Sequence, residues 1–153
     1  MHCYELLDVN TPNAEKLPYL TFKNCYSLRY LHFPKVNGTS SHTFQFCKNL
    51  ETVVLDSITS INDRFFINTP SLRTVVIRQP DSICTLGGGN VFQDTKISLG
   101  EGFIYVPDTL VDGYKAATNW VTYADQIKPL SEYIPCTAIS LNATELTFTS
   151  KQD

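Results

Sequence analysis

The chain has 153 residues, of which 42% are hydrophobic and 18% are charged, and its formal net charge is −3. This composition is typical of a folded globular domain rather than a disordered chain, and the acidic balance argues against a nucleic-acid partner. No apolar run approaches the ~20 residues that a membrane-spanning helix requires, and the opening stretch MHCYELLDVN lacks the basic and apolar regions of a signal peptide.

The chain repeats one pattern every 22 residues. The stretch NCYSLRYLHF at residues 24–33 returns as FCKNLETVVL at 46–55 and as NTPSLRTVVI at 68–77. Leu6 precedes Leu28 by one period, so the chain opens inside a repeat. The recurring apolar columns are Phe22/Phe44/Phe66, Leu28/Leu50/Leu72, Leu31/Val53/Val75 and Phe33/Leu55/Ile77. Several columns at one period predict successive turns of a solenoid whose apolar residues stack into a continuous core.

A period of 20–29 residues with L-x-x-L-x-L spacing is that of leucine-rich repeats, which contribute one short parallel strand per turn. The stretch F-x-N-C-x-S-L-R-x-L-x-F-P at residues 22–34 resembles the BspA-like leucine-rich repeat family of bacterial surface proteins. Thr69 departs from this pattern, because it stands where the family has Cys. The resemblance implies an α/β-type solenoid that forms one domain over residues 1–130, including a C-terminal cap.

The end of the repeat array is predicted to be closed by a helical cap at about residues 107–130. VFQDTKI at 91–97 resembles half of a fourth, stretched unit, and Ile104 and Val106 resume its strand. Pro107 and Asp108 indicate a helix entry, with Asp108 as the N-cap. Apolar residues then follow at helical spacing, namely Leu110, Val111, Tyr114 and Ala117, then Trp120, Tyr123 and Ile127, before Pro129 ends the helix. Such a cap would cover the last apolar face, with Trp120 in its core.

The sequence changes character after Pro135. AISLNATELTFT at 138–149 alternates apolar and polar residues around a polar turn, and it resembles the opening strands of a group-2 bacterial immunoglobulin-like domain. We therefore expect residues 131–136 to be a linker and residues 137–153 to be the truncated start of that domain. The ~100 residues of a complete sandwich are not present, so a fragment of a longer modular protein is expected.

The outward residues of the predicted strands are the best candidate ligand-binding surface. Side chains alternate along a strand, so residues between the core positions face out on the concave sheet. One outward column is Tyr30, Thr52, Thr74 and Phe103, and the other is His32, Val54, Val76 and Tyr105. Their apolar and aromatic character has two explanations, the ordinary preference of such residues for strands or a binding face of the kind that solenoids use.

The sequence gives little sign of catalysis. The five cysteines form no C-x-x-C pair and have no zinc spacing with the three histidines. Cys3, Cys25 and Cys47 share one column and are expected to be buried as small apolar residues. A disulfide between turns is the alternative, which parallel side chains disfavour. His32 is expected to face away from them, and the glycines at 87–89 lack a phosphate-binding motif. We expect no enzyme, no metal and no cofactor.

The resemblance implies a non-catalytic binding or adhesion module of a bacterial cell-surface or secreted protein. Its partner would be a host or bacterial surface protein or a glycan. A structural or virion-associated protein, such as a prophage tail element, is the alternative. Because an uncapped strand edge invites pairing, the start at Cys3 predicts either further upstream repeats or an edge-mediated homodimer.

Overall fold

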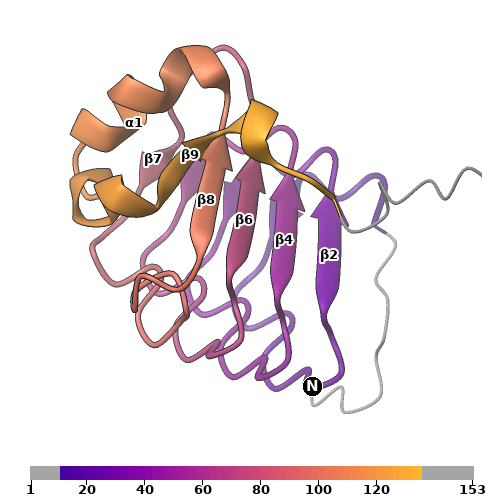
Figure 1. The fold of residues 1–153 in the computed structure, drawn as a ribbon. Coiled ribbons are helices and arrows are strands. Elements are labelled where there is room, and N and C mark those ends of the chain that lie inside the picture. Colours follow the sequence, from indigo (N-terminus) through magenta and orange to yellow (C-terminus); the bar gives the residue numbers. More distant parts are fainter. Residues whose placement is uncertain (1–10, 136–153) are drawn as a thin grey trace, which may run out of the picture.

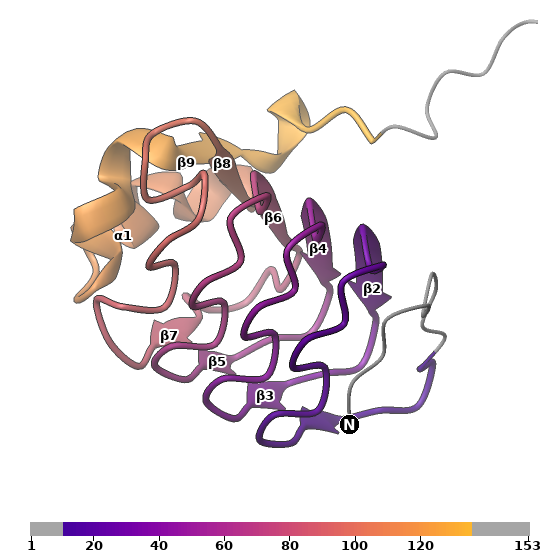
Figure 2. The same cartoon turned by 90° about the horizontal axis from the view of Figure 1, so that it is seen from below.

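A computed structural model describes residues 11–135 of the chain as a solenoid built from two parallel sheets. The two sheets lie on opposite sides of the core (Figures 1 and 2). The larger sheet has the order β2-β4-β6-β8-β9, formed by Tyr30–Phe33, Thr52–Leu55, Thr74–Ile77, Phe103–Val106 and Ile127–Pro129. The smaller sheet has the order β1-β3-β5-β7, formed by Lys16–Leu17, Gly38–Thr39, Ser60–Ile61 and Thr85–Leu86.

The predicted 22-residue register is confirmed. Tyr30 pairs with Thr52, Thr52 with Thr74, and Thr74 with Phe103, all in parallel strands. The leucine column is buried, because Leu28, Leu50 and Leu72 are each 0% exposed. Neighbouring turns therefore bury each other's apolar residues, as a repeat protein requires.

A stack of phenylalanine rings runs along the axis of the core. The ring centroids of Phe22 and Phe44 are 5.2 Å apart, those of Phe44 and Phe66 are 5.7 Å apart, and those of Phe66 and Phe92 are 5.5 Å apart, with nearly parallel planes. Phe92 belongs to the stretched fourth unit, so the extra residues of that unit leave the stack unbroken. Burying each ring stabilises the fold by about 1.5–3 kcal/mol.

Two tight turns lead each coil from the smaller sheet to the larger one. The first turn has a left-handed residue at Leu20, His42 or Arg64, and the second has one at Asn24, Phe46, Asn68 or Asp94. Asn and Asp are among the few types that adopt this conformation readily, which explains why they occupy three of the four second turns.

The cysteine column is buried, as expected for Cys25 and Cys47. The Cys47 thiol donates a hydrogen bond to the carbonyl oxygen of Phe22 at 2.9 Å. One turn later, the Thr69 hydroxyl donates the equivalent bond to the Phe44 carbonyl at 3.0 Å. Thr69 can therefore replace Cys, because its side chain is also small and reaches the equivalent carbonyl of the preceding turn. Cys3 lies outside the described residues.

The cap is confirmed, but it differs from the prediction at both ends. It consists of η1 (Asp108–Leu110), α1 (Val111–Ala116) and η2 (Trp120–Gln126), followed by β9 and η3 (Leu130–Glu132). Asp108 is not an N-cap, because it is the first residue of η1 and its Oδ1 accepts a hydrogen bond from the Ser131 backbone N–H at 3.0 Å. Ile127 is not helical, because it pairs with Ile104 in β9. The open edge of β8 explains this, since its backbone groups need partners.

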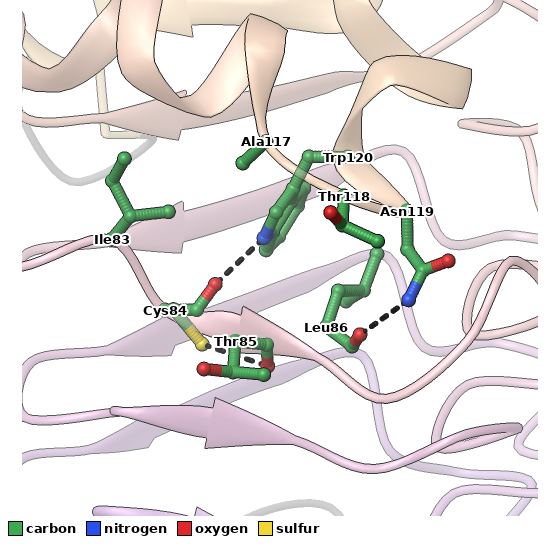
Figure 3. Close-up of a pocket in the computed structure, with 8 residues that line it drawn as sticks. All are labelled: Ile83, Cys84, Thr85, Leu86, Ala117, Thr118, Asn119 and Trp120. Atoms are coloured by element: carbon green, nitrogen blue, oxygen red, sulfur yellow. Dashed lines mark hydrogen bonds between the residues drawn. The ribbon is translucent and has the colours of Figure 1, made fainter.

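Side chains of the cap hold it against β7, the last strand of the smaller sheet (Figure 3). Trp120 Nε1–H donates to the Cys84 carbonyl at 2.7 Å, and Asn119 Nδ2–H donates to the Leu86 carbonyl at 2.7 Å. The Tyr114 hydroxyl accepts the Cys84 backbone N–H at 2.9 Å. Trp120 is 1% exposed, which confirms its predicted place in the core of the cap. These bonds satisfy strand-edge groups that a further strand would otherwise pair.

Within residues 11–135, no helix combines the length and the apolar character needed to cross a membrane. Residues 137–153, where an immunoglobulin-like start was predicted, lie outside the described part of the chain. The predicted pairing edge at Cys3 lies outside it as well.

Candidate binding surface

The predicted surface residues all lie on the larger sheet, on strands β2, β4, β6 and β8. Tyr30, Thr52, Thr74 and Phe103 form one row across the sheet, with the side chains of Tyr30 and Phe103 exposed by 51% and 40%. Both threonines are half-buried. We call this row the outer strip, because it lies on the sheet face turned away from the core.

The second predicted column is only partly accessible. His32 and Tyr105 are half-buried, but Val54 and Val76 are each 0% exposed, so the expectation that these two valines are exposed is wrong. The segment after β9 crosses this side of the larger sheet (Figures 1 and 2), and the Tyr133 ring lies 5.2 Å from the Tyr105 ring. In the strand register the two short valines lie between the larger side chains of His32 and Tyr105. Period-2 alternation predicts the face of a residue but not what covers that face.

A cluster of charged residues borders the N-terminal ends of the strands. Glu51 bridges two arginines, with Arg29 Nη1 at 3.3 Å from its Oε1 and Arg73 Nη2 at 3.6 Å from its Oε2. The three residues occupy the same position in successive repeats, directly before or next to the outer strip. Such exposed pairs stabilise a fold by only ~0–1 kcal/mol, so their main effect is to hold the guanidinium groups in place.

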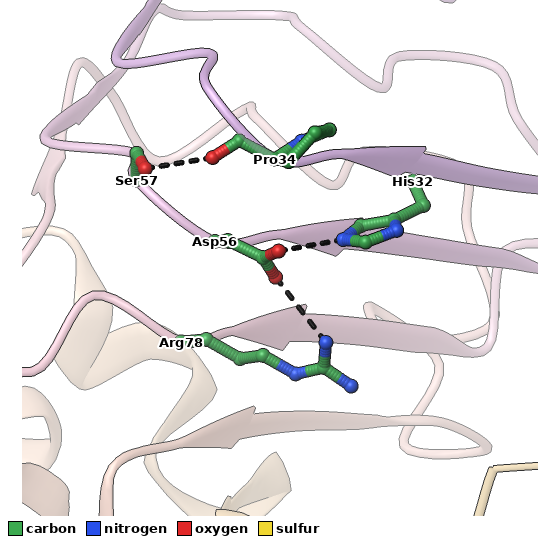
Figure 4. A network of polar contacts seen from close by, with 5 residues as sticks. All are labelled: His32, Pro34, Asp56, Ser57 and Arg78. Carbon is green, nitrogen blue, oxygen red and sulfur yellow. Dashed lines mark hydrogen bonds and ion pairs between the residues drawn. The ribbon is translucent and has the colours of Figure 1, made fainter. Parts of the chain in front are cut away.

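A second cluster borders the C-terminal ends of the strands (Figure 4). His32 Nε2 lies 2.6 Å from Asp56 Oδ2, and Arg78 Nη1 lies 3.3 Å from Asp56 Oδ1. The outer strip therefore lies between two groups in which one carboxylate bridges side chains from both neighbouring repeats. Sequence reasoning missed both clusters, although the 22-residue spacing of Arg29, Glu51 and Arg73 is a readable signal.

Lysine and aromatic neighbours fix the rings at the C-terminal end of the outer strip. Lys128 Nζ lies 5.7 Å from the centre of the Phe103 ring, a distance at which a cation is attracted to a ring face. The Phe103 and Tyr105 rings have centroids 6.4 Å apart. Burial, with a smaller contribution from the Glu132 charge, raises the pKa of the Tyr105 hydroxyl. Tyr105 therefore stays neutral and able to donate a hydrogen bond.

The repeats match a known family of sequences. Residues 1–98 match the BspA-type leucine-rich repeat region, in six copies. The chain belongs to the BspA-type leucine-rich repeat family. BspA-type repeats are typical of bacterial surface proteins and are typically non-catalytic. No curated protein and no solved structure matches the chain.

On this BspA-type surface, His32 and the nearby Ser57 have separate hydrogen-bond partners. His32 is paired with Asp56, while the nearby Ser57 hydroxyl donates to the Pro34 carbonyl at 2.7 Å and not to the imidazole (Figure 4). A nucleophile needs such a base beside it. Within the described residues, no group of three or more His, Cys, Asp or Glu side chains is placed to hold a metal ion.

The cap of the BspA-type array contains a cavity of about 290 Å³ between β7 and η2 (Figure 3). Cys84 lines it, but burial raises the pKa of this thiol from 9.0 to about 12. The thiolate is the nucleophilic form of cysteine, so Cys84 is inert at neutral pH.

Proposed function

We propose that the protein is a non-catalytic binding or adhesion module of a bacterial cell-surface or secreted protein, and that the outer strip receives a protein or glycan partner. The observation that carries the proposal is the exposure of Tyr30 and Phe103 on a sheet whose aliphatic side chains are buried. Exposed apolar groups that are rimmed by charge mark interaction sites.

The outer strip combines the contacts that recognition needs. The two rings stand three strand spacings apart, or about 14 Å, with the Thr52 and Thr74 hydroxyls between them. Aromatic side chains supply apolar area with little loss of conformational entropy, and the hydroxyls donate and accept hydrogen bonds. Parallel strands hold these groups rigidly, so little ordering is needed on binding.

The two charged clusters add selectivity to the outer strip. Their basic side chains, Arg29, Arg73 and Arg78, have exposed fractions of 71%, 53% and 40%. The carboxylates of Glu51 and Asp56 between them are less exposed, at 35% and 28%. A partner that approaches the strip therefore meets guanidinium groups at both borders, and such groups bind carboxylates and carbonyl oxygens well.

A screen against immobilised glycans and host extracellular proteins tests the proposal. The wild type is expected to bind at least one partner, and Tyr30→Ala combined with Phe103→Ala is expected to weaken that binding by about tenfold or more. Both side chains are exposed, so the variant is expected to keep the circular dichroism spectrum and melting temperature of the wild type.

Tyr19→Ala is the matched control. Tyr19 is 62% exposed and lies on a turn next to His42, away from the outer strip. Its removal is expected to leave binding unchanged. Equal binding by all three proteins would show that the partner docks elsewhere and would refute the role of the outer strip.

We also propose that residues 131–136 form a linker and that residues 137–153 begin an immunoglobulin-like spacer. Residues 130–132 form η3, so the proposed linker begins against the cap. Expression of a longer segment of the gene, followed by limited proteolysis, tests this organisation. A protected sandwich-sized fragment that begins near residue 137 is expected.

A further inference from the structure

A second surface lies on the turns between the two sheets, separate from the outer strip. The second turn of each coil places Asn24, Phe46, Asn68 and Asp94 at the same left-handed position. Asn and Asp tolerate this conformation through their short polar side chains, whereas a bulky aromatic residue does not. Phe46, with φ of 63°, is therefore the one member of this column whose residue type works against the fold.

Backbone strain alone does not mark a site, because Leu20, His42 and Arg64 also have positive φ in the first turns. Phe46 differs because its ring lines a depression of about 230 Å³, together with Lys48, Asn68, Pro70 and Asp94. Lys23 Nζ lies 5.9 Å from the centre of the same ring. Strained residues that persist at a cost in stability are concentrated at ligand sites.

We propose that this depression binds one neutral hexose unit of a glycan, with its apolar ring face on Phe46. The depression is smaller than the ~300–1,000 Å³ of sites for drug-sized ligands, which suits a single ring. The face of an aromatic ring carries partial negative charge and attracts the polarised C–H bonds on one side of a pyranose. The Pro70 ring extends this apolar surface.

The polar groups of the depression match the hydroxyls of a sugar. The Asn68 amide both donates and accepts, and the Asp94 carboxylate accepts. Neither side chain makes a hydrogen bond or ion pair to another residue in the described range 11–135, so both are available to a ligand. Among the lining residues, Lys48 supplies one ammonium group and Asp94 one carboxylate, and Lys23 adds a second ammonium group at the Phe46 ring. The hydroxyl groups of a neutral sugar both donate and accept, so they can bond to both kinds of charged group.

The test uses methyl glycosides of glucose, galactose, mannose and N-acetylglucosamine, each titrated into the ¹⁵N-labelled chain. At least one is expected to shift the amide resonances of Phe46, Lys48, Asn68 and Asp94. Phe46→Asn is expected to weaken that binding by about tenfold, or ~1.4 kcal/mol, while the melting temperature stays the same or rises. If Phe46 were retained only for packing, Phe46→Asn would lower the melting temperature.

Arg64→Asn is the matched control. It relieves the same backbone conformation at an exposed position outside the depression, so the melting temperature should stay the same or rise while sugar binding is unchanged. The paired Tyr30→Ala and Phe103→Ala changes should also leave sugar binding intact, which separates this site from the outer strip. No shift with any of the four sugars, equal sugar binding by Phe46→Asn, or shifts with a proline-rich peptide alone would each overturn the proposal.

Discussion

Leu50→Ala tests the stacked core at its centre. Leu50 is 0% exposed, and its column neighbours Leu28 and Leu72 are equally buried in the adjoining turns. Leu→Ala substitutions in cores cost about 2–5 kcal/mol, and the larger values arise where the surroundings cannot collapse into the cavity. Here β2, β4 and β6 are held at the ~4.8 Å spacing of a hydrogen-bonded sheet. We therefore expect a loss in the upper part of that range, about 3–5 kcal/mol.

Urea unfolding followed by circular dichroism measures this loss in the free energy of unfolding. Leu99→Ala is the control, because it makes the same chemical change at a leucine that is 70% exposed, and it should cost at most about 0.5 kcal/mol. A loss below ~0.5 kcal/mol for Leu50→Ala, or an equal loss for both variants, would refute the stacking of the repeats.

Four further substitutions, at Thr69, Trp120 and Cys84, probe two hydrogen bonds and one titration. Thr69→Cys should be nearly neutral, because a thiol at the equivalent position already donates to a carbonyl, whereas Thr69→Val should lower the free energy of unfolding by about 0.5–1.5 kcal/mol. Trp120→Phe should cost about 1–3 kcal/mol by leaving the Cys84 carbonyl without its indole donor, and a melting temperature equal to that of the wild type would contradict this. Burial raises the pKa of Cys84 from 9.0 to about 12, so the unfolded chain loses this proton first. Stability should therefore be complete below pH 9 and fall as the pH rises towards 12, with a shallower fall in Cys84→Ala.

Much of the larger sheet was predictable because the apolar residues recur at the same 22-residue step that separates paired strand residues. The columns through Leu28 and Phe22 required only counting in steps of 22, and each column is buried where it was predicted. The cap was predictable for the same reason, since Tyr114 and Trp120 are large apolar groups at helical spacing and both are buried.

The smaller sheet was not predicted, because its strands are only two residues long, although Lys16, Gly38 and Ser60 recur at the same 22-residue step. Gly38–Thr39 and Ser60–Ile61 are typical of turns when read as sequence. Their pairing depends on the coils that place them side by side. The strand at Ile127 was also missed, because an apolar residue at helical spacing fits a strand equally well when an unpaired edge is nearby.

The candidate site was only half predictable from the sequence. Alternation correctly placed Tyr30 and Phe103 on an exposed face. It also predicted that Val54 and Val76 are exposed, whereas both are buried. Their burial depends on tertiary contacts of the whole face, which residue spacing does not record. The bridging role of Asp56 likewise depends on a histidine and an arginine from different repeats.

The binding role of the outer strip is tested most directly by mapping the contact with a partner from the screen. Amide chemical shifts of the ¹⁵N-labelled chain would be recorded with and without that partner. The largest changes are expected at Tyr30, Thr52, Thr74 and Phe103, with smaller ones at the two charged clusters. Changes confined to the smaller sheet or the cap, with the outer strip unaffected, would contradict the proposed binding surface.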